Sequence, residues 1–313
     1  MLANLERTLM IAAADLREAN TGRLGREFFY SQFEISKGRK KTGRLITAPS
    51  PALRDLHRLL LVLGIRDIPT HHASTAFRAG CSIAANARRH AAQPYLFKTD
   101  IVDFFPSIPV EGLAHLLRDA FESFSRDAQA ALVEVVGLHG CLAQGSPVSP
   151  HLSNVFMREF DHKMFKFSKA AGARYTRYAD DIAISASSET RLASLADATR
   201  AEVGKLGLRT NETKTRIVGP SQRKIVTGLD VTTTDIRPTK KFRKKTEAML
   251  RAFLKYEKAG MIEPLRGRLA FWNGVAPHDP VLRALRKDLF GRIDEHINTQ
   301  EEPTRLLRSF KRS

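Results

Sequence analysis

The sequence predicts an α+β fold in which helices cover one face of an antiparallel sheet, followed by a helical second domain. From Tyr95 onward, stretches with the alternating pattern of strands are separated by stretches with apolar residues at helical spacing, in the order β-α-α-ββ-α-β. After about Pro238 the sequence becomes helical and basic. These observations place one domain over residues 1–236 and a second over residues 237–313.

The N-terminal part combines a helix with a basic hairpin. Residues up to about 35 have the pattern of a helix, and residues 37–49 hold a cluster of cations followed by a short strand-like stretch. A further strand candidate, residues 95–98, leads into Asp100. Ser107 and Pro109 then carry the start signals of a helix, so a strand is expected to lead into a helix through an acidic turn.

The middle of the chain predicts a long helix, a hairpin and another helix. After Pro150, apolar residues spaced for one buried stripe occupy six positions: Leu152, Val155, Phe156, Phe160, Met164 and Phe167. Residues 174–185 then form two β-rich arms around Ala179, Asp180 and Asp181, which predicts a hairpin with acids at its tip. The stripe of the last helix, over residues 192–206, ends at Gly207, a natural C-cap.

The charge indicates a polyanionic partner. Lys and Arg number 51 against 33 Asp and Glu, a net charge of +18, so nucleic acid or an anionic membrane is expected. A membrane span needs about 20 consecutive apolar residues, and the run from Leu59 to Ile65 is far shorter. Because the N-terminus also lacks the pattern of a signal peptide, we expect a cytoplasmic protein in which Cys81 and Cys141 are reduced thiols.

Three carboxylates indicate phosphoryl transfer. Two divalent ions about 3.5–4 Å apart can activate a hydroxyl and neutralise a leaving pyrophosphate, and Mg²⁺ needs only one or two carboxylates besides phosphate and water. Asp100 and the pair Asp180-Asp181 could meet if their strands are neighbours. An isolated Asp-Asp pair is more often a polar turn, but the alternating arms around it favour a metal site. Asp103 is expected to help cap the following helix instead.

Three motifs carry a family resemblance. FKTDIVDFFPSI, LAQGSPVSPHLSN and YADDIAIS resemble motifs A, B and C of reverse transcriptases. GLRTNETKT, residues 207–215, resembles motif D, and RLITAP, residues 44–49, resembles the fingers motif. The resemblance spans roughly residues 30–230 and implies an RNA-directed DNA polymerase of right-hand architecture. Fingers and palm would occupy residues 1–236, and a basic helical thumb residues 237–313.

The resemblance also implies roles for single residues. Asp100, Asp180 and Asp181 would be the catalytic carboxylates and would bind two Mg²⁺ ions, with the Ile101 carbonyl as a further ligand. Phe105 matches the steric gate that rejects a ribose 2′-OH, although a core position beside Phe104 also fits its type. The other residues expected to bind the deoxynucleoside triphosphate are Lys40 or Lys41, Arg44, Gln144, Gly145 and Lys214. Lys214 would protonate the pyrophosphate, although an ordinary surface lysine fits equally well.

Two further motifs narrow the family. The segment from Asn86 to His90 and the segment Val226-Thr227-Gly228 resemble signatures of retron reverse transcriptases. The resemblance implies that RNA or DNA is bound by five of these residues: Asn86, His90, Val226, Thr227 and Gly228. His90 alone would also fit a histidine that caps a basic helix. The resemblance implies self-primed copying of a structured non-coding RNA from a 2′-OH, giving a branched RNA–DNA molecule (msDNA). It further implies binding of the RNA–DNA hybrid, a role in anti-phage defence, and room for an effector protein as partner.

Three other functions fit this sequence less well. The basic stretch 240–251, in which Lys241, Arg243 and Lys244 are expected to contact RNA or DNA, lacks the Trp-rich apolar face of a membrane-surface helix. A group II intron-type or other standalone reverse transcriptase would be expected to carry a further catalytic extension, whereas 313 − 228 = 85 residues follow Gly228. The intact carboxylates argue against an inactive nucleic-acid-binding protein.

Overall fold

The computed structural model of the chain describes residues 2–20, 29–35, 43–256 and 261–287. The chain forms two compact units, one of Met1–Ser82 with Tyr95–Ile217 and the other of Ile83–Pro94 with Val218–Ser313. This division differs from the boundary expected after residue 236. The reason is that the segment after Val218 forms a small sheet that packs on the helix within residues 83–94.

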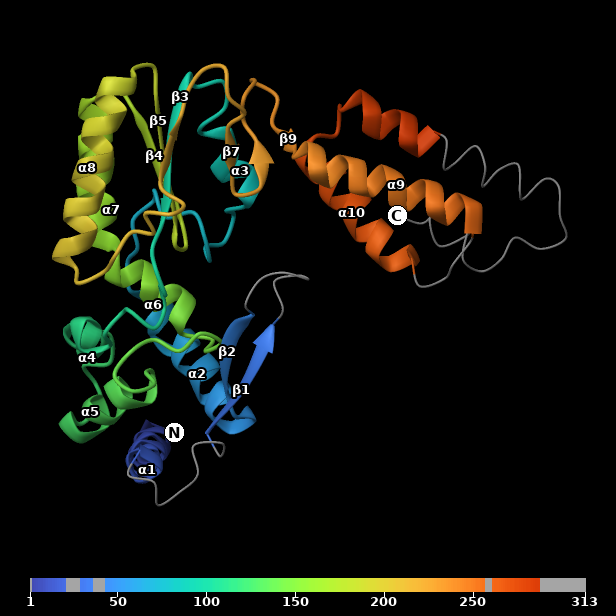
Figure 1. Cartoon of the computed structure of the whole chain (residues 1–313). Helices are drawn as coiled ribbons and strands as arrows, with labels where there is room; N and C mark the ends of the chain where they lie inside the picture. The colour runs from blue at the N-terminus through green and yellow to red at the C-terminus, as the bar shows by residue number, and fades with distance from the viewer. Residues whose placement is uncertain (1, 21–28, 36–42, 257–260, 288–313) are drawn as a thin grey trace, which may run out of the picture. The chain divides into compact units, whose positions relative to one another are not determined.

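A four-stranded sheet forms the centre of the first unit (Figure 1). The strands follow the order β4-β5-β3-β6, with β5 antiparallel to both of its neighbours. Their bounds are β3 Tyr95–Asp100, β4 Arg174–Tyr178, β5 Asp181–Ala186 and β6 Arg216–Val218. The expected hairpin around Ala179 and Asp180 is therefore confirmed. β3 and β5 are adjacent, which is the condition under which the acidic strand ends can meet.

Helices α7 (Arg158–Ala170) and α8 (Glu189–Lys205) lie on one face of this sheet, as the sequence predicts (Figure 1). The expected long helix after Pro150 is wrong in one respect. The chain breaks at buried Met157, which ends α6 (Ser149–Phe156) and precedes α7. The apolar stripe is consequently not continuous, and Phe167 is 44% exposed.

Two expectations for the first unit are corrected. Tyr30–Ile35 (β1) is a strand rather than helix, because it pairs along its whole length with β2, Arg44–Pro49. The cationic segment of the expected basic hairpin, residues 36–42, lies outside the described residues. No helix begins at Ser107, because Pro109 forms a β-bridge with Cys141 and the helical path starts only with the 3₁₀ turn Glu111–Leu113. The remaining elements are α1 Leu2–Asn20, α2 Pro51–Leu63, the 3₁₀ turn Ile65–Asp67, α4 Ala114–Ala120 and α5 Arg126–Val135.

The second unit joins a small sheet to a helical bundle. Its strands, in the order β7-β8-β9, are Ile225–Val226, Leu229–Asp230 and Arg237–Pro238, and α3 (Ile83–Arg88) packs against β8. Two long helices follow, α9 (Lys240–Tyr256) and α10 (Ile262–Val275), and residues 280–287 are helical. Leu250, Phe253 and Leu265 form their shared core. The helical character expected after Pro238 is thus confirmed for the described residues.

Two further properties of the described chain bear on its setting. None of the helices in the described ranges is long and apolar enough to cross a membrane. Cys81 and Cys141 are free thiols, as expected.

Candidate active site

The end of β3 and the start of β5 place two carboxylates opposite each other. Asp100 is the last residue of β3 and pairs in register with Asp181, the first residue of β5. The turn before Asp181 is held to the same strand end, because the Ile101 amide donates a hydrogen bond to the Asp180 carbonyl at 3.2 Å. The three acids expected to meet therefore share one edge of the sheet.

Burial, the neighbouring carboxylate and two lysines together set the electrostatics of the acids. Burial raises the pKa of Asp181, and the neighbouring Asp100 carboxylate raises it further, while Lys98 and Lys214 oppose the shift. Asp100 is buried and forms an ion pair with largely exposed Lys214, whose Nζ lies 2.5 Å from its Oδ2. This hydrogen bond raises the pKa of Lys214, so the lysine is fully protonated at neutral pH.

The residues at this edge fit a hard divalent cation. Carboxylate and carbonyl oxygens are the ligands that such ions prefer, and within the described chain no backbone amide donates to the Ile101 carbonyl. The pKa of Asp181 is raised first by burial and then by the Asp100 carboxylate, and a bound cation would offset both effects. Within the described ranges, no three His, Cys, Asp or Glu side chains lie close enough together to hold a metal ion. Instead, the Lys214 ammonium supplies the compensating positive charge at Asp100.

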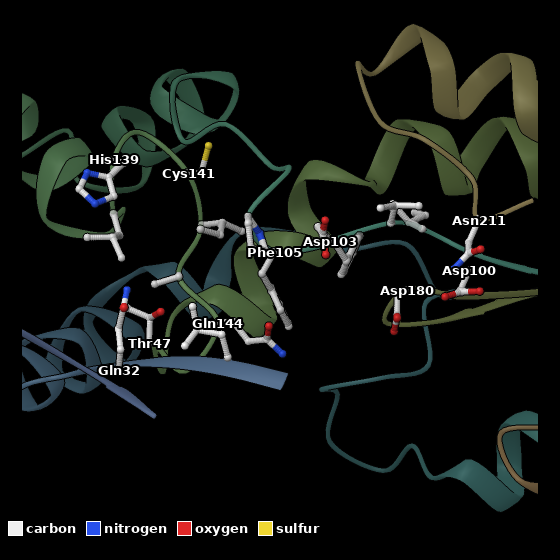
Figure 2. Close-up of a pocket in the computed structure, with 18 of the residues that line it drawn as sticks. Gln32, Thr47, Asp100, Asp103, Phe105, His139, Cys141, Gln144, Asp180 and Asn211 are labelled. Atoms are coloured by element: carbon white, nitrogen blue, oxygen red, sulfur yellow. The ribbon is translucent and has the colours of Figure 1, made fainter. Parts of the chain in front are cut away.

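A pocket of about 670 Å³ is lined by Asp100 and Asp180, whereas Asp181 lines a smaller one of about 200 Å³. Asp100, Asp180 and Asn211 lie at one end of the larger pocket, and Gln32, Thr47 and Gln144 at the other (Figure 2). Phe105 lies between the two groups (Figure 2). Asn211 was not singled out from the sequence, although it precedes Lys214 by three residues in the segment that resembles motif D. Its backbone amide donates to the Asp100 carbonyl at 2.8 Å, which holds this segment beside the acids.

The loop after Leu142 is fastened to β2 at Gly145. The Thr47 amide donates to the Gln144 carbonyl at 2.8 Å. Gly145 adopts φ +134°, a conformation essentially reserved for glycine. A Cβ at this position would lie 2.8 Å from the Thr47 carbonyl oxygen. A glycine is therefore required both for the turn and for the close approach of β2.

The neighbouring aromatic residues Phe104 and Phe105 both line the pocket. Phe104 is buried in the core, whereas Phe105 is half-buried. The Phe105 ring also faces Phe77, with centroids 6.2 Å apart. Phe77 is 47% exposed and adopts a left-handed backbone conformation, φ +59°, which is rare for an aromatic residue. Sequence reasoning missed Phe77, because backbone strain of this kind has no sequence signal.

Three of the predicted nucleotide contacts cannot be placed as side chains. Lys40 and Lys41 lie outside the described residues, and so does the side chain of Arg44, whose backbone belongs to β2. Their roles stay predictions. The other expected members of this group, Phe105, Gln144, Gly145 and Lys214, are described above.

The two segments of the retron signature meet in the second unit. Thr227 and Gly228 form the two-residue turn between β7 and β8, both with positive φ, as a type I′ hairpin requires. The Thr227 hydroxyl donates to the Ile83 carbonyl at 3.2 Å, which ties the turn to the start of α3. Asn86 and His90 are 1% and 0% exposed. Their burial favours a role in holding α3 against the hairpin over direct contact with RNA.

The three predicted contacts of the helical segment lie on α9. Lys241 and Lys244 are exposed, and Arg243 is half-buried. On the neighbouring helix, Arg268 stacks over Phe242 at 4.0 Å and donates to its carbonyl, which fixes the first turn of α9. The exposed ammonium groups of Lys241 and Lys244 on an ordered helix suit contact with a phosphate backbone.

Comparison with known proteins agrees with this site. Residues 35–233 match the family described as reverse transcriptase (RNA-dependent DNA polymerase). The chain is 29% identical over 249 residues to the retron Ec86 reverse transcriptase of Escherichia coli, covering 78% of this chain and 76% of that protein. It is 31% identical over 217 residues to the retron Ec73 reverse transcriptase of Escherichia coli, covering 64% and 68%. The chain therefore belongs to the reverse transcriptases, RNA-directed DNA polymerases, and within them to the bacterial retron type.

Other relatives are longer than this chain. The match to the retron Mx162 reverse transcriptase of Myxococcus xanthus is 30% identical over 282 residues and covers 79% of this chain but 58% of that protein. Among solved structures, telomerase from Candida albicans superposes with a TM-score of 0.51, 12% identity and coverage of 95% of this chain and 70% of that one. Apo telomerase from Candida tropicalis gives a TM-score of 0.52 at 12% identity, covering 84% and 61%. These likenesses support the α+β polymerase fold alone.

Proposed function

We propose that this chain is the polymerase of a retron, acting in the cytoplasm to copy a structured non-coding RNA into DNA. Synthesis would start from a 2′-OH of that RNA and give msDNA, with anti-phage defence as the biological role. The observation that carries the polymerase assignment is the register pair Asp100–Asp181 together with a pocket lined by Asp100, Asp180 and Phe105. The retron assignment rests on the relatives and on the joined segments around Asn86 and Thr227.

The carboxylates would hold two Mg²⁺ ions, with the Ile101 carbonyl as a further ligand. When bound, such ions activate the attacking hydroxyl and neutralise the leaving pyrophosphate. Buried Asp100 and half-buried Asp181 supply carboxylate oxygen atoms from two adjacent strands, so their spacing is set by the sheet rather than by a loop. Asp180, on the turn, would complete the set.

Residues around the pocket would bind and orient the incoming nucleotide. Lys214 stands protonated beside Asp100 and can give a proton to the leaving pyrophosphate. Arg44, with Lys40 or Lys41, would hold the triphosphate, a role for which the planar guanidinium fork is suited. Phe105 would exclude a ribose 2′-OH, and Gln144 with the Gly145 backbone would contact the nucleotide or its template.

The second unit would hold the RNA. Under this proposal, residues 1–236 act as fingers and palm and residues 237–313 as thumb, with the α3 and β7–β8 contact as a rigid platform beside it. The cations Lys241, Arg243 and Lys244 on α9 would track the backbone of the RNA–DNA hybrid. An effector protein encoded nearby is a further proposed partner.

The test is to purify the protein with the non-coding RNA encoded beside it and to analyse the DNA that forms. We expect DNA whose 5′ end is released by debranching enzyme, because it is joined to an internal guanosine 2′-OH. Samples are taken early, since later trimming would remove the branch. Asp180→Asn, which removes charge without changing size, serves as the inactive control. DNA that debranching leaves unchanged at every time point would exclude the retron mechanism and leave a conventionally primed reverse transcriptase.

A further inference from the structure

Arg177 is a fully buried cation in β4, and β5 separates this strand from β3, which carries Asp100. Its Nε and Nη2 atoms donate to the two carboxylate oxygens of Asp161 at 2.9 and 2.6 Å, a bidentate pair. The Tyr175 hydroxyl donates to the same carboxylate at 2.6 Å. Burial lowers the pKa of Arg177, but Asp161 raises it by more, so the guanidinium stays charged in the core.

The fork reaches beyond this ion pair to the acidic turn. Arg177 Nη1 donates to the Ala179 carbonyl at 2.9 Å. Ala179 directly precedes Asp180 and adopts a left-handed conformation, φ +57°, which costs an alanine about 1–2 kcal/mol. The hydrogen bond from Arg177 therefore holds the turn before Asp180 and Asp181 in an unfavourable backbone conformation.

A second branch of the same group runs through Asn154 of α6. Arg177 Nη2 donates to Asn154 Oδ1 at 3.2 Å, and the Asn154 amide donates to the Ala76 carbonyl at 2.9 Å. The Ser74 hydroxyl donates to the same Asn154 oxygen at 2.6 Å. The Asn154 side chain therefore holds the segment 74–76 at both of its ends, Ser74 and Ala76.

This fixed segment leads directly to Phe77. The backbone of Arg177 pairs with it as well, since its amide donates to the Ala73 carbonyl at 3.0 Å and its carbonyl accepts from the Thr75 amide at 2.8 Å. Phe77 then projects with a strained backbone and faces Phe105 in the pocket. The Arg177 guanidinium is therefore hydrogen-bonded to the turn before Asp180 and, through Asn154, to the segment that precedes Phe77.

We propose that Arg177 is a positioning residue of the active site, which sets the Asp180-Asp181 turn and, through Asn154, the place of Phe77 beside Phe105. The proposal rests on the polymerase function proposed above. Stability alone does not require this arrangement, because a buried ion pair can often be replaced by apolar residues at no loss. What an apolar pair could not supply is the hydrogen bond to the Ala179 carbonyl.

The decisive variant replaces the whole ion pair. Arg177→Met with Asp161→Leu leaves no uncompensated buried charge, so the double variant is expected to fold. Tyr175→Phe is the matched control, because it removes a buried hydrogen bond to Asp161 while leaving the bond to the Ala179 carbonyl intact. Arg177→Lys is the second variant, since one ammonium keeps the charge but cannot reproduce the fork.

Three measurements are made on the full chain: thermal unfolding, single-nucleotide extension of a DNA primer on RNA, and backbone hydrogen exchange. We expect the double variant and Arg177→Lys to remain folded while kcat falls about a hundredfold, the size of loss that a small misplacement of reacting groups gives. KM for the nucleotide should change little. Exchange should accelerate over residues 178–182 and at Ile101, whose amide bonds to the Asp180 carbonyl. Tyr175→Phe should keep both kcat and exchange.

Either of two results would overturn the proposal. One is a folded Arg177 variant with the kcat of the wild type, and the other is lost activity with unchanged exchange at residues 178–182 and Ile101. If the double variant does not fold, Arg177→Lys decides by the same criteria. Failure of the wild type to extend any primer would refute the polymerase function instead, and the exchange experiment would still decide the positioning claim.

Discussion

The ammonium of Lys214 lies 2.5 Å from Oδ2 of Asp100, although the two residues are 114 positions apart in the sequence. The contact joins the segment that resembles motif D to the end of β3. It keeps a protonated lysine at the edge of the pocket while its side chain remains largely exposed. A mobile, charged group beside a buried carboxylate is well placed to donate a proton during turnover.

Lys214→Met should therefore slow nucleotide addition by about 10²–10⁴-fold, the range of general acid catalysis, with little change in KM. Single-turnover incorporation of one deoxynucleotide measures the effect. Lys163→Met is the matched control, because Lys163 is also an exposed lysine paired with a carboxylate, that of Glu202, away from the pocket. Equal rates in the Lys214 variant and this control would assign Lys214 to the surface rather than to catalysis.

Phe105→Val should relax discrimination against ribonucleotides by about ten- to a hundredfold, the usual effect of reshaping one wall of a pocket. The physical reason is that Phe105 lines the pocket and is half-buried, whereas Phe104, which also lines the pocket, is buried in the core. The measurement compares kcat/KM for a ribonucleotide and for the matching deoxynucleotide. Phe104→Leu should lower the free energy of unfolding and leave the ratio as it is. An unchanged ratio in Phe105→Val would return this residue to a packing role.

Gly145→Ala should disrupt the contact between β2 and the loop that carries Gln144. The strained φ alone costs about 1–3 kcal/mol, and the added Cβ would also meet the Thr47 carbonyl oxygen at 2.8 Å. Gly140→Ala is the matched control, because Gly140 also has a positive φ but nothing lies within 4 Å of its Cβ position. Urea unfolding and KM for the nucleotide are compared. If both variants lose equal stability and keep KM, the close approach at Thr47 is unimportant for the site.

The sequence was sufficient for the parts of the fold that have a local signal. The alternating arms around Asp180 predicted the β4–β5 hairpin, and the apolar period predicted α8, which ends at Lys205, two residues before left-handed Gly207. The meeting of Asp100 with Asp181 could be stated only as a condition, because strand order is not encoded locally. Tyr30–Ile35 was misread as helix for a related reason, since its identity as a strand depends on pairing with β2.

Other parts of the site had no sequence signal at all. Arg177 stands among cations in a strongly basic chain and reads as an exposed residue, yet it is buried because Asp161 of α7 packs directly against β4. The left-handed conformations of Phe77 and Ala179 depend on the contacts that hold them. Burial of Asn86 and His90 likewise follows from packing on β8, which no spacing rule reveals.

The free energy of unfolding should fall as the pH drops from 6.5 towards 4, in part because of His57. This histidine is buried and its Nε2 donates to the Val135 carbonyl, while Nδ1 accepts from the Ser146 hydroxyl, so the neutral ring is fully bonded. Burial lowers its pKa from 6.5 to about 4, although the bond to Val135 opposes the shift. Between these pH values the unfolded chain binds the extra proton, so stability is complete above 6.5 and declines below it, by about 3 kcal/mol in total.

Urea titrations at several pH values between 4 and 7 check this prediction by comparing the wild type with His57→Gln. His71 and His151 also have lowered pKa values because of burial and contribute to the slope in both proteins. The difference between the two curves therefore isolates His57. We expect the variant to be less stable at pH 7 but to show a shallower decline. Parallel curves would mean that His57 is protonated equally in the folded and unfolded states.

Thr227→Val should impair initiation on the cognate RNA more than extension of an annealed primer. The substitution keeps the size and branching of the side chain but removes the hydroxyl that donates to the Ile83 carbonyl. Thr227 is β-branched and left-handed, so its conformation is costly without that bond. Loss of the Thr227 hydroxyl should detach the β7–β8 turn from α3, while the acids of the first unit keep their register across β3 and β5.

The measurement is the ratio of two rates in one preparation: first-nucleotide addition to the RNA 2′-OH and extension of a DNA primer on a generic template. Thr233→Val is the matched control, because the Thr233 hydroxyl donates to the Asp235 carbonyl within an exposed loop. A lowered ratio only in Thr227→Val supports RNA positioning by this contact. If both rates fall together, the turn matters for folding alone, and the structured RNA must be held elsewhere.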